Sequence, residues 1–111
     1  LAACWATGAF RHLVLAPAFP ALGRVTRGGR VLSRRGAGWH PHGDLGALLR
    51  AEGLRATLGD AAAPLPDGIT VFDAESDEDL ARIAALRGAG PVLWAGSGGL
   101  ARALATPAAP D

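Results

Sequence analysis

Short apolar segments alternate with polar or glycine-rich stretches along the chain, and this pattern predicts strands and helices in alternation. The apolar run at residues 12–16 ends at Pro17, which suits a buried strand of a parallel sheet. Residues 24–27 and 30–33 flank Gly28-Gly29, a two-residue turn of the kind that closes a β-hairpin. The first third of the chain therefore predicts one buried strand followed by a hairpin.

The middle of the chain is less regular. Residues 34–43 are polar and glycine-rich, and they predict irregular structure. Leucines then recur at helical spacing and predict a helix over about residues 44–52, with Gly53 as its stop. Residues 54–58 predict a weak strand, and residues 59–68 form an Ala- and Pro-rich loop.

The clearest pattern lies between residues 69 and 95. Buried strands are predicted at residues 69–72 and 91–95. Ser76 and Asp79 resemble a capping box that opens a helix running to about residue 87. Because about 20 residues separate the two strands, they are expected to lie parallel in one sheet.

These elements predict an α/β fold: part of an open, mainly parallel sheet with flanking helices and a small β-hairpin. A tight turn at residues 96–99 and a short helix at residues 100–105 complete it. We assign residues 1–106 to one partial α/β domain, in which residues 1–10 resemble a helix entered midway. Residues 107–111 are expected to start a linker.

Composition limits the protein to a single domain with a thin core. The chain has 111 residues, 50% of them hydrophobic, but much of that fraction is Ala, and Gly contributes 16 residues. The sequence has no Met, so Leu1 is expected to be a processed or cut end. Cys4 is the single cysteine and cannot form an internal disulfide, which favours a reducing, cytoplasmic location. No convincing base lies near it in the sequence, so Cys4 is expected to be inert. The longest apolar run has ten residues and contains two prolines, so no membrane span is predicted.

Charge is distributed unevenly. Residues 1–43 hold six Arg and no acid, whereas residues 44–111 hold five Arg and all ten acids. The basic half is interpreted as a solvated surface or a contact with an acidic partner domain, with an anion-binding site as the alternative. No aromatic residue interleaves the five Arg of residues 24–35, so nucleic-acid binding is not predicted.

Candidate chemistry is expected at the carboxyl ends of the predicted strands, where ligands collect in open parallel sheets. The turn made by Gly96, Ser97, Gly98 and Gly99 would bring backbone amides and one hydroxyl to a helix N-terminus, which suits a phosphate. The alternative is a purely structural tight turn in which Ser97 is an ordinary N-cap.

Two further groups of polar residues carry weaker signals. Asp73 at a strand end is a candidate general base or metal-adjacent carboxylate, but the acidic run that it begins also complements a helix N-terminus. His40, His42 and Asp44 superficially resemble metal ligands, yet their loop offers no Cys partner, and no metal site is predicted.

Three blocks of sequence carry a family resemblance. They are Pro-Ala-Phe-Pro-x-x-Gly-Arg-x-Thr at residues 17–26 with the following Gly28-Gly29, Val-Phe-Asp-Ala-Glu-Ser-Asp-x-Asp-Leu at residues 71–80, and Gly-Ser-Gly-Gly-Leu-Ala-x-Ala-Leu-Ala at residues 96–105. In order and spacing the chain resembles the second half of the amino-terminal, sugar-binding domain of the four-carbon acid sugar kinases. Gly98 stands where that family has Ala.

The resemblance implies part of an ATP-dependent kinase that phosphorylates a terminal hydroxyl of a four-carbon sugar acid such as threonate or erythronate. It implies ATP and Mg²⁺ as cofactors, a nucleotide contact at residues 96–99, and sugar-acid contacts from Arg24 and Asp73. It further implies an amino-terminal Asp-Asp-x-Thr-Gly segment and a carboxyl-terminal nucleotide-binding domain, neither of which these 111 residues contain. The loop at residues 34–42 is shorter than the family's.

Neither a catalytic base nor magnesium ligands can be assigned, so this chain alone is expected to be inactive. The competing interpretation is a non-catalytic phosphate- or nucleotide-binding α/β module. The sequence leaves the particular sugar acid and the oligomeric state open, a homo-oligomer included.

Overall fold

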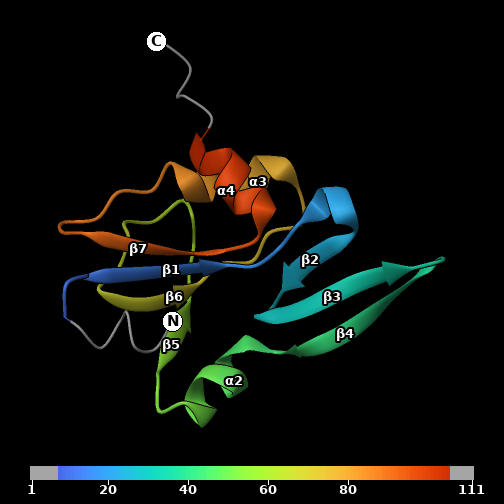
Figure 1. Cartoon of the computed structure of the whole chain (residues 1–111), viewed down its shortest axis with the longest axis horizontal. Coiled ribbons are helices and arrows are strands. Elements are labelled where there is room, and N and C mark those ends of the chain that lie inside the picture. The colour runs from blue at the N-terminus through green and yellow to red at the C-terminus, as the bar shows by residue number, and fades with distance from the viewer. Residues whose placement is uncertain (1–7, 106–111) are drawn as a thin grey trace.

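The structure is a computed structural model that describes residues 8–105. The expected amino-terminal helix and the expected linker therefore lie largely outside the described residues, and residues 8–10, which are described, are not helical. Two sheets make up the fold, and Figure 1 shows them side by side. One is parallel and layered with helices, and the other is a three-stranded antiparallel sheet.

The parallel sheet contains four strands in the order β5-β6-β1-β7. The strands are β1 (His12–Ala16), β5 (Ala56–Leu58), β6 (Gly68–Val71) and β7 (Val92–Gly96). Strand β1 lies at the centre and pairs in parallel with β6 on one side and β7 on the other. The predicted α/β class and the parallel arrangement of the two later strands are confirmed.

Helices cover both faces of this sheet (Figure 1). Helices α3 (Asp77–Ala84) and α4 (Gly98–Ala105) contribute Leu80, Ile83 and Leu100 to the larger core. Val14 and Ala16 of β1 belong to the same core. The shorter helix α2 (Leu45–Ala51) places Leu49 against the opposite face. The period-two alternation of the strands therefore divides the apolar side chains between two cores.

Helix α3 begins where its capping signal predicted. The Ser76 hydroxyl accepts a hydrogen bond from the Asp79 amide at 3.1 Å, and the Asp79 carboxylate accepts one from the Glu75 amide at 2.9 Å. The helix ends at Ala84, three residues before the predicted end. The Arg87 guanidinium donates to the Ala84 carbonyl at 3.0 Å and so satisfies one of the acceptors left at the helix terminus.

The antiparallel sheet has the order β2-β3-β4. Strands β2 (Arg24–Arg27) and β3 (Arg30–Arg35) form the predicted hairpin. Gly28 and Gly29 have φ of 61° and 77°, the positive pair that a type I′ turn requires. A short 3-10 helix, η1 (Pro20–Leu22), connects β1 to this hairpin.

The prediction of irregular structure over residues 34–43 was wrong, because Gly38–Asp44 forms strand β4 and pairs with β3. Most of β4 is exposed, so its sequence shows no apolar alternation that could have announced a strand. Pro41 is tolerated because β4 lies at the edge of its sheet.

Candidate functional site

The antiparallel sheet is attached at the carboxyl edge of the parallel sheet, the edge where ligands were expected. Thr26 of β2 exchanges two backbone hydrogen bonds with Ala74, just beyond β6, at 2.9 and 3.1 Å. The loops that follow β1, β6 and β7 therefore share one edge with the hairpin (Figure 1). This edge is the candidate functional site.

Asp73 anchors the hairpin turn to this edge. Its two carboxylate oxygens accept hydrogen bonds from the Gly28 amide at 2.7 Å and from the Gly29 amide at 2.9 Å. None of the roles expected from the sequence anticipated this contact: general base, metal-adjacent carboxylate, helix-start acid or sugar-acid contact. Each oxygen still has a lone pair to offer a ligand.

A stack of charged and aromatic groups continues along the hairpin. The Arg27 guanidinium pairs with the Glu75 carboxylate, and this hydrogen bond raises the pKa of Arg27. Arg27 and Arg34 both lie 5.9 Å from the centre of the Trp39 ring, within cation–π range. Trp39 therefore lies beside the basic hairpin in space, although it is outside residues 24–35 in the sequence.

Arg24 lies at the opposite end of β2 from the turn that Asp73 holds. Its backbone pairs with Phe19, at 3.1 Å through its amide and 2.8 Å through its carbonyl. Its side chain is exposed, and within residues 8–105 the guanidinium has no hydrogen bond or ion pair. The backbone of Arg24 therefore lies about 13 Å, four residues of extended strand, from that of Gly28, which Asp73 holds.

The glycine-rich turn lies at the end of β7, and α4 begins within it at Gly98, two residues earlier than predicted. The Ser97 hydroxyl donates to the Ala18 carbonyl and accepts from the Gly99 amide at 3.1 Å. A side chain at Gly96 would collide with the Ala16 carbonyl oxygen, 2.4 Å from the position of its Cβ. Close packing therefore explains why Gly96 is a glycine. Gly98 is exposed, and its backbone amide at the start of α4 can donate to an anion.

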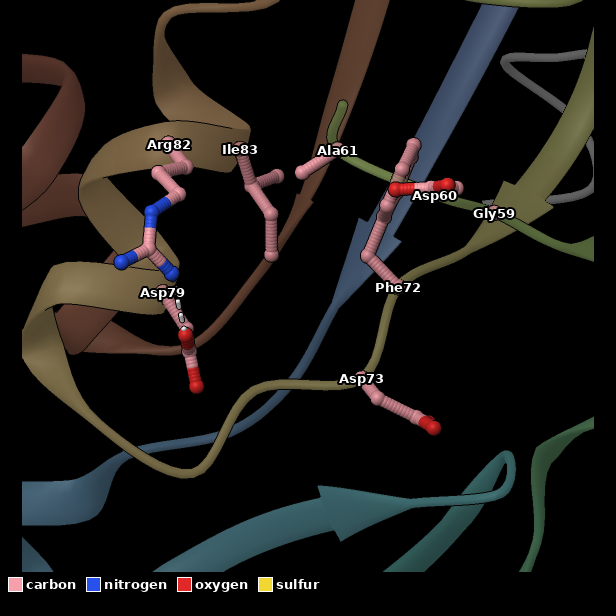
Figure 2. A pocket seen from close by; sticks show the side chains of 8 residues that line it. All are labelled: Gly59, Asp60, Ala61, Phe72, Asp73, Asp79, Arg82 and Ile83. Atoms are coloured by element: carbon pink, nitrogen blue, oxygen red, sulfur yellow. Dashed lines mark hydrogen bonds and ion pairs between the residues drawn. The ribbon is translucent and has the colours of Figure 1, made fainter. Parts of the chain in front are cut away.

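A pocket of about 230 Å³ lies at the carboxyl ends of β5 and β6. Figure 2 shows its lining, which comes from the loop after β5, the end of β6 and one side of α3. The lining residues are Gly59, Asp60, Ala61, Phe72, Asp73, Asp79, Arg82 and Ile83. Of the residues predicted as a site, only Asp73 borders this pocket.

Three carboxylates and one guanidinium determine the electrostatics of the pocket. Asp79 accepts from the Glu75 amide and from Arg82 at 2.9 Å, and its pKa is lowered, first by the Glu75 hydrogen bond. Asp60 accepts from the Ala62 amide at 2.8 Å. All three carboxylates are thus held by donors within the protein.

Sequence reasoning missed Asp60 and Arg82. Asp60 lies two residues beyond β5, so the strand-end rule that selected Asp73 would also have selected Asp60 had the weak strand been given more weight. Arg82 has the i, i+3 spacing to Asp79 that favours ion pairs on a helix, but this signal is common and points to no particular site.

Two classes of feature are absent from the part of the chain that the structure describes. Residues 8–105 hold no group of three or more His, Cys, Asp or Glu side chains that could bind a metal ion. No helix within the same range is long and apolar enough to cross a membrane. His42, one of the superficial metal ligands, instead hydrogen-bonds to Ser33.

Comparison with known proteins identifies relatives. The family model described as a sugar-binding N-terminal domain matches residues 40–104, more than half of the chain. A D-threonate kinase from Cupriavidus necator is 41% identical over 122 residues. That alignment covers 85% of this chain and 29% of the relative, so the chain spans less than a third of the length of this curated protein.

Proposed function

Because the chain belongs to the four-carbon acid sugar kinase family, we propose that it forms part of an ATP-dependent kinase acting on a terminal hydroxyl of a sugar acid such as threonate or erythronate. One observation supports this proposal most: the pocket, the hairpin and the glycine-rich turn all lie at the carboxyl edge of the parallel sheet. A phosphate donor and a polyol acceptor both need binding groups at one edge for the transfer to occur in line.

Within this proposal the turn at residues 96–99 contacts a phosphate of the nucleotide. The Gly98 amide at the start of α4 is the contact we assign, since the Ser97 hydroxyl and the Gly99 amide already have partners. Gly96 and Gly99 then keep the turn close to β1 and α3 rather than binding the ligand.

Arg24 and Asp73 remain our proposed contacts to the sugar acid. Arg24 offers an exposed, planar pair of donors that matches a carboxylate. Asp73 offers its remaining lone pairs to a sugar hydroxyl. The two residues lie at opposite ends of β2, so the exposed Arg24 side chain has to reach along the strand for one ligand to contact both.

The described residues do not fit a magnesium site, since no cluster of potential ligands is present among them. No step is therefore assigned to a metal held by this chain. We propose that the metal ligands and the catalytic base belong to other segments of the enzyme, and that the enzyme works in the reducing cytoplasm, where ATP is available.

The test is turnover by the full-length protein that contains this chain. ADP release with ATP, Mg²⁺ and a panel of threonates and erythronates should exceed the rate with butyrate, which has the carboxylate but no hydroxyl. The 111-residue chain alone should release no ADP above the protein-free control. A full-length protein that is active on no four-carbon sugar acid would overturn the proposal.

A further inference from the structure

The antiparallel sheet projects from the parallel sheet as an arm. Figure 1 shows the turn between β3 and β4 pointing away from the body of the structure. Residues 34–42, which surround this turn, are all exposed, whereas Thr26 and Ala74 anchor the other end of the arm through two backbone hydrogen bonds. The described part of the chain therefore leaves the outer part of the arm open to a partner.

One face of the arm gathers the residue types that dominate protein–protein contacts. Residues opposite each other in the register, and every second residue along a strand, share a face of a sheet. The pairs Arg27↔Arg30 and Arg34↔Trp39 therefore lie on one face together with Leu32↔Pro41. Trp39 is 40% exposed at the edge strand of this face. Exposed Trp and Arg side chains are the commonest anchors of protein interfaces.

The arginines of this face are mostly without acidic partners. Arg27 is paired with Glu75. The guanidinium groups of Arg30 and Arg34 form no hydrogen bond or ion pair within residues 8–105. Asp44 lies opposite Arg30 in the register, but its carboxylate caps α2 instead. The face is therefore positively charged, and the planar donors of Arg match carboxylates in a partner.

Free carboxylates are available at the start of α3. Asp77, Glu78 and Asp79 form the first turn of that helix, and Asp79 is already bonded to the Glu75 amide and to Arg82. Asp77 and Glu78 are exposed, and in the described range their carboxylates form no ion pair. One copy of the chain thus leaves cations on the arm and anions on α3 unmatched, and a second copy can match both.

We propose that the arm is a dimerisation element whose Trp39 face packs against the start of α3 in a second copy of the chain. The free arginines of the arm then meet the free carboxylates of that helix. Each copy supplies one arm and one helix start, so a two-fold axis repeats the contact. Strand addition at the edge of β4 is the weaker alternative, because Pro41 in the middle of β4 offers no amide.

Sedimentation equilibrium of the full-length protein that contains this chain tests the proposal. We expect a monomer–dimer equilibrium in low salt, because an interface of this small size gives a weak dimer. About 1 M NaCl, where the Debye length is about 3 Å, should weaken the dimer about tenfold or more. A protein that stays monomeric in low salt up to its solubility limit would overturn the proposal.

An exchange of charges locates the contact. Arg34→Glu and Glu78→Arg each place like charges at both copies of the contact, and each should weaken the dimer about tenfold or more. An equal mixture of the two variants should dimerise again, because both contacts then join opposite charges. Arg55→Glu is the matched control, since it makes the same charge change at an exposed site outside the arm and should leave the dimer unchanged. Circular dichroism melting verifies that each variant is folded.

Two further outcomes would overturn the proposal. A dimer that both single variants leave unchanged, or two folded variants that do not dimerise when mixed, would show that copies associate through another surface. A monomeric wild type that binds oligothymidylate, with the binding lost in Arg34→Glu, would make the arm a nucleic-acid surface instead. The kinase proposal is judged separately by ADP release, so either proposal can fail while the other stands.

Discussion

Gly96→Ala should destabilise the protein strongly, because a side chain at Gly96 would collide with the backbone of β1. The added Cβ would lie 2.4 Å from the Ala16 carbonyl oxygen and 2.6 Å from Leu100 Cδ2. Carbon atoms in contact normally stand about 3.5 to 4.0 Å apart, so the end of β7 must move by about an ångström. Ala16 is fully buried and its oxygen belongs to the backbone, so it has nowhere to retreat.

Overpacking of this kind costs about 2 to 3 kcal/mol when the obstructing atom cannot rotate away. For a domain of this size that loss lowers the Tm by about 10 to 20 °C. Circular dichroism melting and urea unfolding of the two proteins measure it directly. A loss below about 1 kcal/mol would refute the argument, because it would mean that the end of β7 is loosely packed.

Gly98→Ala is the matched control, two residues further along the same turn. Its Cβ would meet Phe19 Cε2 at 2.7 Å, but that atom is the tip of a half-buried side chain that can rotate. Ala also gains up to about 1 kcal/mol of helix propensity over Gly within α4. The stability change should therefore stay within about 1 kcal/mol, and a larger loss than that of Gly96→Ala would reverse the predicted order.

Three other outcomes are expected. Ser97→Ala removes an N-cap and should lower the free energy of unfolding, measured in urea, by about 1 to 2 kcal/mol. The free energy of ATP binding to the full-length protein should change by much less. Arg24→Lys should raise the KM for the sugar acid without lowering stability, and an unchanged KM would exclude a bidentate contact. The hydrogen bonds that lower the pKa of Asp79 below its usual 3.8 stabilise the folded protein at pH values above 3.8. Asp79→Asn should therefore be less stable than wild type at pH 7, and this difference in stability should shrink as the pH falls below about 4.

Elements with local signals could be predicted from the sequence. Residues 12–16 are apolar and end at a proline, and Ser76 and Asp79 have the spacing of a capping box, so β1 and the start of α3 follow from neighbouring residues. The hairpin follows from Gly28-Gly29, because few residues other than glycine tolerate the positive φ of its turn.

Strand β4 could not be predicted, because it depends on a partner rather than on its own composition. Its backbone is held by the free edge of β3, from Arg30↔Asp44 to Arg35↔Gly38, while its side chains bury little surface. Such a strand has no period-two pattern to detect. The same holds for the pocket, since Asp60 beyond β5 and Arg82 on α3 border one pocket only in the folded chain.

Asp73 connects the two parts of the site. The same carboxylate borders the pocket and accepts from both amides of the hairpin turn. A hydroxyl bound to Asp73 must therefore share this carboxylate with Gly28 and Gly29. If the turn's contacts strengthen or weaken ligand binding, the ligand strengthens or weakens those contacts by the same coupling free energy. Arg24 lies at the far end of the same strand, β2, which two hydrogen bonds between Thr26 and Ala74 anchor to the parallel sheet. The position of the hairpin therefore affects two parts of the site: Asp73 at the border of the pocket and Arg24 on β2.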